Sequence, residues 1–133
     1  MTSIRDVYRA VKVRLSDVGL NAYDYVPGAS EWPGALVLPP NSVHVDGAGR
    51  APMVLRFEVL VLVSGAIDEN QLQLLDYMDV AGGKSILKAF GDDPSLGFPD
   101  VHVRVTESRV LGFEEQAGYQ AYGAMFEFVA MVG

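Results

Sequence analysis

Residues 53–64, with the sequence MVLRFEVLVLVS, are the stretch that decides the fold. Every odd position of this stretch is apolar, so one face of a strand made from it meets a core. The even positions begin with Val54, Arg56 and Glu58 and become apolar from Leu60 onward. We therefore predict a long β-strand that is wet on one side at its start and covered on both sides at its end.

Two amphipathic helices are predicted, one before and one after this strand. Apolar residues recur at three- and four-residue steps from Ile4 to Val18, and Gly19 ends this N-terminal helix. The second helix follows the strand, with Asp68 as its N-cap and Gln71 three residues later. The apolar residues assigned to its buried face are Leu74, Leu75 and Met78.

The segment GGKS, residues 82–85, raises the question of a phosphate-binding loop. The Walker pattern requires a glycine five positions before the glycine that precedes the lysine, and it requires a buried strand before the loop. Met78 occupies that position, inside the predicted helix. We therefore interpret the segment as a break between two helices, the second of which is capped by Ser85, runs through Phe90 and is closed by Gly91.

The last third of the chain is predicted to be β-structure. Valines alternate with polar residues over residues 101–106, which is typical of a half-buried strand. Residues 109–113 continue this strand after an irregularity near Glu107. Residues 121–132 form the final strand, with apolar side chains at every second position. These two segments predict a C-terminal hairpin.

A Pro- and Gly-rich arm covers residues 26–52 and holds five of the seven prolines. Only residues 35–38 and 42–45 within it are predicted to be short strands. An irregular stretch of this length is often a functional loop in a compact domain. Together the elements predict one α+β domain over residues 1–133. Its mainly antiparallel sheet would carry the N-terminal helix and the central helix pair on one face.

The composition excludes several classes of protein. Seventeen acidic against ten basic residues give a net charge of −7, which argues against a protein that grips nucleic acid. No cysteine is present, so thiolate catalysis and cysteine-based metal sites are excluded. His44 and His102 belong to no recognisable metal or catalytic motif. The apolar runs are too short for a membrane helix, and no signal peptide is recognisable, so we expect a soluble chain.

Candidate partner contacts come from charge and from aromatic residues. Arg5, Arg9 and Lys12 follow one stripe of the predicted first helix, which fits either a docking surface or a solvated helix face. Aromatic and apolar residues near the arm and the C-terminal turn fit either anchors for a partner or the chain's own core. The full set of candidate residues is Arg5, Arg9, Lys12, Tyr23, Tyr25, Trp32, Val43, Val45, Met53, Phe113, Tyr119 and Tyr122.

Taken together, these segments resemble the tail terminator (tail completion) proteins of long-tailed, non-contractile bacteriophages. The resemblance covers nearly the whole chain, from the N-terminal helix to the last strand. Besides that helix, the segments that carry it are ALVLPP (35–40), LRFEVLVLVS (55–64), GGKSILKAFGDDPSLG (82–97) and YQAYGAMFEFVAMV (119–132).

The resemblance implies a structural virion protein without catalytic activity or a cofactor. Such a protein is made in the host cytoplasm and forms a hexameric ring on the head-proximal end of the tail tube. The ring stops tube polymerisation and offers a docking surface to head-completion (neck) proteins. DNA passes through its lumen without specific binding. The basic stripe would then face an acidic partner protein, and reversing its charges would leave ring formation intact.

Other functions fit the same residues. Within the virion, a neck or head-closure protein or a tail tube subunit could have a related α+β design. From a different class, the chain could be a small cytoplasmic ligand-binding or enzyme domain that uses the arm as a lid. A tube subunit would polymerise into long tubes, and a ligand-binding domain would have a concave pocket with convergent polar groups.

Overall fold

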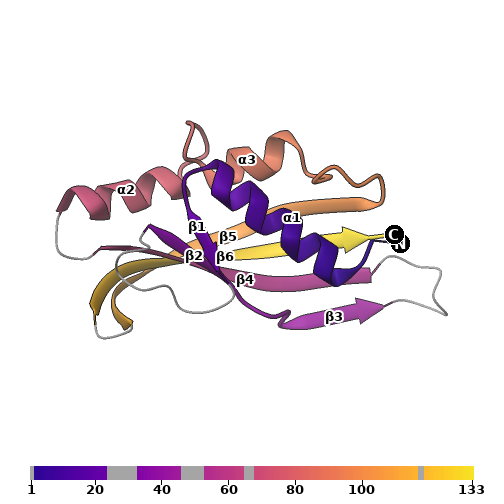
Figure 1. Ribbon diagram of the computed structural model, residues 1–133, viewed down its shortest axis with the longest axis horizontal. Coiled ribbons are helices and arrows are strands. Elements are labelled where there is room, and N and C mark those ends of the chain that lie inside the picture. The colour runs from indigo at the N-terminus through magenta and orange to yellow at the C-terminus, as the bar shows by residue number, and fades with distance from the viewer. Residues whose placement is uncertain (1, 24–32, 46–52, 65–67, 117–118) are drawn as a thin grey trace.

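The computed structural model describes residues 2–23, 33–45, 53–64, 68–116 and 119–133. Within these residues the fold is α+β, with three helices on one face of a mixed, mostly antiparallel six-stranded sheet (Figure 1). The elements in chain order are α1 (Ile4–Asp17), β1 (Asn21–Tyr23), β2 (Gly34–Val37), β3 (Ser42–Val45), β4 (Met53–Ser64), α2 (Asp68–Met78), α3 (Ile86–Asp92), β5 (Val101–Gln116) and β6 (Tyr119–Val132).

The sheet is built around the predicted long strand. Its strand order is β1-β2-β4-β6-β5, and β3 pairs with the start of β4, on the same edge as β2. The β1–β2 pair is parallel, which the sequence did not predict, and the other pairs are antiparallel. β4 pairs with β6 along its whole length. A mainly antiparallel sheet is therefore confirmed.

The burial of β4 follows the predicted pattern. Its odd positions are all buried and face the helices, whereas Arg56 is exposed and Glu58 is half-buried on the opposite face. Toward the end of β4 the opposite face is covered as well, because Leu36, Leu60 and Leu62 form a second apolar cluster there. One side of strand β4 is thus exposed to solvent at its start, and both sides are covered at its end, as expected.

Helix α1 begins and ends close to the predicted residues. The Ser3 hydroxyl caps its first turn by accepting a hydrogen bond from the Asp6 amide at 3.1 Å. Gly19 follows the helix with a φ of 92°, a left-handed conformation that glycine adopts without strain. Val7 and Leu15 are among the residues that it buries against the sheet.

Helices α2 and α3 depart from the prediction in three details. Asp68 is the first residue of α2 and not a cap that precedes it, and α3 continues through Gly91 to Asp92. Leu75 is 51 % exposed, so its assignment to the buried face was wrong. Tyr77 is buried beside Leu74 instead, because it lies three residues further along the core-facing side of the helix.

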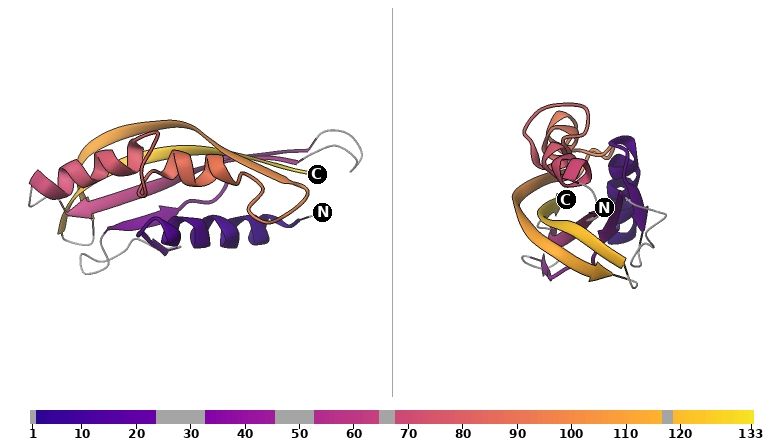
Figure 2. Two further views of the ribbon diagram at one scale, coloured as in Figure 1. Left: turned by 90° about the horizontal axis from the view of Figure 1, so that it is seen from above. Right: turned by 90° about the vertical axis from the view of Figure 1, so that its left-hand side faces the viewer.

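The C-terminal hairpin is confirmed and longer than predicted. β5 pairs with β6 from Val101 to Gln116, with register shifts between Val105 and Glu107 and between Val110 and Gly112. The first shift lies next to the predicted irregularity. Such bulges bend a strand and increase its twist. The hairpin curves accordingly in both views of Figure 2.

The two short strands predicted within the arm are confirmed, with the first one shifted by one residue. Residues 33–45 contain β2 and β3, both of which pair with β4. β2 is buried along its length between β1 and β4, so this part of the arm belongs to the domain itself. The flanking residues 24–32 and 46–52 lie outside the described residues.

Candidate protein-interaction site

The predicted basic stripe lines a hollow on the surface of α1. Arg5, Arg9 and Lys12 border this hollow, and Ile4 and Tyr8 complete its lining. Its volume is about 390 Å³. All five residues come from one flank of α1, because positions three and four apart share a helix face. We call these five residues the basic flank.

Tyr8 fixes the position of the basic flank against the sheet. Its hydroxyl donates a hydrogen bond to the Leu38 carbonyl oxygen at 2.7 Å, just beyond the end of β2. Its ring centroid lies 5.0 Å from that of Phe57 in β4. Burial raises the pKa of the Tyr8 phenol to about 12. The half-buried ring of Tyr8 therefore holds this side of α1 in place against the sheet.

Two charges of the basic flank, those of Arg5 and Arg9, are available to a partner. Arg5 and Arg9 are exposed, and neither forms a hydrogen bond or an ion pair with any residue that the structure describes. Two unneutralised guanidinium groups on a rigid helix attract acidic surfaces and steer their approach. The arrangement is suited to protein–protein docking.

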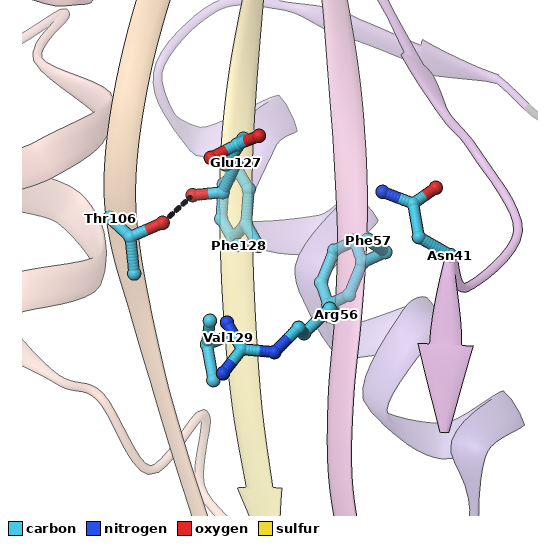
Figure 3. Close-up of a pocket in the computed structure, with 7 residues that line it drawn as sticks. All are labelled: Asn41, Arg56, Phe57, Thr106, Glu127, Phe128 and Val129. Atoms are coloured by element: carbon cyan, nitrogen blue, oxygen red, sulfur yellow. Dashed lines mark hydrogen bonds between the residues drawn. The ribbon is translucent and has the colours of Figure 1, made fainter. Parts of the chain in front are cut away.

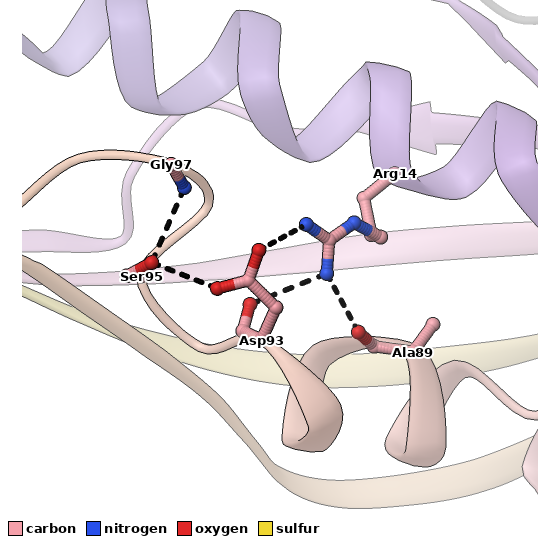
Figure 4. Close-up of polar contacts among 5 residues, drawn as sticks. All are labelled: Arg14, Ala89, Asp93, Ser95 and Gly97. Carbon is pink, nitrogen blue, oxygen red and sulfur yellow. Dashed lines mark hydrogen bonds and ion pairs between the residues drawn. The ribbon is translucent and has the colours of Figure 1, made fainter.

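Arg14, the remaining basic residue of this helix, has a different role (Figure 4). Its guanidinium donates to the carbonyl oxygens of Ala89 at 2.7 Å and Asp93 at 3.2 Å, and it pairs with the Asp93 carboxylate at 3.1 Å. Hydrogen bonding by Ser95, and then by Arg14, lowers the pKa of Asp93. Arg14 thus joins the end of α1 to the end of α3 and is not a docking residue.

Of the other candidate residues, those whose side chains the structure describes do not line the hollow of the basic flank. Val43 and Val45 are exposed on β3, at 47 % and 53 %. Met53 is buried in the core and Tyr122 packs partly against it, so both fit the alternative of contacts within the chain. Tyr25 and Trp32 lie outside the described residues, as do the side chains of Tyr23, Phe113 and Tyr119.

A polar depression lies on the sheet face opposite the helices (Figure 3). It holds about 120 Å³ and includes Arg56, Thr106 and Glu127. The Thr106 hydroxyl donates to the Glu127 carbonyl oxygen at 3.3 Å, where β5 bulges. Glu127 on β6 lies directly across from Glu58 on β4. Arg109 pairs with both carboxylates, at 3.6 Å from Glu127 and 3.1 Å from Glu58. These contacts neutralise neighbouring like charges on adjacent strands.

The hollow beside GGKS is unsuited to phosphate. It holds about 250 Å³, and Asp76 and Asp79 border it together with Gly82, Gly83 and Lys84. The Ser85 hydroxyl is fully buried, accepts a hydrogen bond from the Lys88 amide at 3.0 Å and donates to the Asp79 carbonyl oxygen. Two carboxylates repel a phosphate, and the serine is committed to capping α3. The interpretation as a break between helices is confirmed.

The two histidines lie apart on the sheet. His44 and His102 are exposed at opposite ends of one row across β3, β4, β6 and β5. Adjacent strands are about 4.8 Å apart, which puts three strand spacings between them. In the described part of the chain, no three side chains of the metal-ligating types are grouped closely enough to hold an ion.

None of the described helices has both the length and the apolar character that a membrane span requires.

Two features of the surface escaped the sequence reasoning. The anchoring role of Tyr8 has a weak signal, since this residue lies four positions after Ile4 beside the apolar stripe. On α2, Leu72 and Leu75 are exposed at 61 % and 51 %, and only the burial of Tyr77 shows which way the helix is turned.

Neither a protein-family model nor a curated protein sequence matches this chain.

Proposed function

We propose that this protein is a structural subunit of a bacteriophage virion that closes into a ring and caps the head-proximal end of the tail tube. The ring, a hexamer by resemblance to tail terminator proteins, stops tube polymerisation and then receives the neck proteins. The observation that carries the proposal is the basic flank, where two guanidinium groups pair with no described residue on a chain whose net charge is −7. Such a surface is complementary in charge to the acidic surface of a partner macromolecule.

The rest of the molecule supports the same function. A net charge of −7 suits a lumen through which DNA slides without sticking, because like charges repel. Each contact in a ring can be modest, because repeated contacts to a symmetric tube add through effective concentration. On the sheet face opposite the helices, Arg109 bridges the carboxylates of Glu58 and Glu127, so these three groups are engaged with one another.

The experiment is an assembly assay with the tail tube protein of the same virion. Purified protein is added to growing tubes, and electron microscopy gives the tube length distribution and the state of each tube end. We expect capped tubes that stop growing, and rings in the protein preparation itself. Uncapped tubes of unchanged length would refute the proposal. Long tubes made by this protein alone would identify a tube subunit, and a monomer stabilised by small metabolites would identify a ligand-binding domain.

A further inference from the structure

The outward face of α2 is apolar and acidic. Leu72 and Leu75 point away from the core, on the side opposite Leu74 and Tyr77, and Asp76 is exposed beside them. Val80, just beyond the helix, is 73 % exposed. Three large apolar side chains with acidic neighbours form a small patch of the kind that marks a protein contact. We call Leu72, Leu75, Asp76, Asp79 and Val80 the acidic face.

The acidic face continues into the hollow beside residues 81–84. Asp76 and Asp79 border this hollow, and Lys84 is the one described basic residue in its lining. The Asp79 carboxylate accepts a hydrogen bond from the Val80 amide at 2.7 Å and remains exposed. Neither aspartate forms an ion pair with any residue in the described part of the chain. The hollow therefore offers two open carboxylates next to apolar surface.

We infer that the basic flank of one copy docks on the acidic face of the next copy. The two surfaces are opposite in charge and each includes apolar groups, Ile4 and Tyr8 on one side and Leu72 and Leu75 on the other. Such pairing gives correct register as well as attraction. The inference rests on the proposed function, which requires a ring, and it names the acidic partner of the basic flank.

The two surfaces cannot meet within one molecule. The basic flank is the side of α1 where Tyr8 reaches Leu38, just beyond β2, whereas Arg14, on another side of the same helix, reaches α3. α2 and α3 follow one another end to end along one side of the helix layer, and α1 runs along the other side (Figure 2). A contact between different patches of identical chains is heterologous, and repetition of it closes a ring when the rotation permits.

This assignment replaces an expectation from the sequence. The stripe of Arg5, Arg9 and Lys12 was expected to face an acidic partner protein, so reversal of its charges was expected to leave ring formation intact. With the acidic face in place, reversal of Arg5 and Arg9 is expected to break the ring. DNA is excluded as the occupant of the acidic face, since phosphates and carboxylates repel each other.

The test is a charge exchange between two variants. Variant one carries Arg5→Glu and Arg9→Glu, and variant two carries Asp76→Arg. Each variant alone juxtaposes like charges, so we expect the concentration for half-assembly to rise at least about tenfold in sedimentation velocity. An equimolar mixture restores every contact in an alternating ring, so we expect assembly to return. Circular dichroism establishes that both variants are folded.

Two further variants sharpen the result. Arg104→Glu reverses an exposed arginine on the sheet face opposite the helices and should leave assembly unchanged. Leu72→Ser removes apolar surface from the acidic face without changing charge and should weaken assembly. Rings that persist in both charge variants, or a mixture that fails to assemble, would overturn the inference and leave the proposed function standing. A wild-type protein that forms no ring, alone or on tube ends, would overturn both.

Discussion

Replacement of Arg14 by methionine tests how the helix layer is held together. Arg14 is buried along most of its length, with 19 % of its side chain exposed. It donates two hydrogen bonds to backbone carbonyl oxygens, those of Ala89 and Asp93, at the end of α3. Methionine keeps most of the side-chain volume and removes all of these bonds. The substitution therefore isolates the polar contribution of Arg14 from its packing.

The expected loss follows from the two carbonyl bonds. A hydrogen bond with a charged partner contributes about 1.5–3 kcal/mol, and water can replace part of it at this half-open site. The ion pair with Asp93 adds little, because solvent screens the half-exposed carboxylate. We expect the free energy of unfolding to fall by about 2 kcal/mol. For a domain of this size, that loss lowers Tm by about 5–8 °C.

The assay is thermal unfolding by calorimetry, with urea unfolding as a second measurement. Arg5→Met is the matched control, because Arg5 lies on the same helix and has no polar contact with any described residue. Its effect should stay within about 0.5 kcal/mol. Asp93→Asn keeps both carbonyl bonds and should destabilise less than Arg14→Met. Equal effects of Arg14→Met and Arg5→Met would refute the reasoning that Arg14 joins the two helices.

Two other predictions concern buried polar groups. Burial raises the pKa of Tyr8 to about 12, whereas an unfolded tyrosine titrates near about 10. In this interval the folded state keeps the proton that the unfolded state loses, so stability should fall as pH rises from about 10 to about 12. Urea midpoints at about pH 9 and about pH 11 measure the decline, which Tyr8→Phe should reduce; an equal decline in both proteins would contradict the assignment. Ser85→Ala should lower the free energy of unfolding by about 1–3 kcal/mol, because the α3 cap is lost and the Asp79 carbonyl is left unpaired. Lys84→Ala, at the exposed neighbouring position, should change it by less than about 0.5 kcal/mol in the same denaturant titration, and equal effects would refute the capping role.

The parts of the fold that could be predicted are those with a strong period. β4, β6 and α1 each repeat apolar residues at the spacing of their own structure, so their buried faces and approximate bounds followed from the sequence. β1 spans three residues, which is too short for any period to show. Its parallel pairing with β2 depends on where the end of α1 places the chain relative to the sheet. The sequence pattern gives no signal for that position.

The candidate site was predictable only in part. The basic flank follows from helical spacing, and the structure adds the hollow and the support from Tyr8. The acidic face was missed because Leu74, Leu75 and Tyr77 are all compatible with a buried side of α2. Helical spacing alone does not tell which of these residues faces the core when apolar residues lie on several sides of a helix. The choice is made by the sheet, which accepts Leu74 and Tyr77 and turns Leu75 to solvent.

The rotation of α2 explains why the chain exposes leucine while it buries tyrosine. Tyr77 fills the core beneath α2, and its hydroxyl accepts a hydrogen bond from Gln73 at 3.3 Å, so burial leaves its polar end satisfied. A small rotation that buried Leu75 would move Tyr77 out of the core. Leu72 and Leu75 therefore remain outward in a solitary subunit, where their apolar surface favours association. In the proposed ring the leucines supply an attraction that salt does not screen, and the charges of the two surfaces set which faces meet.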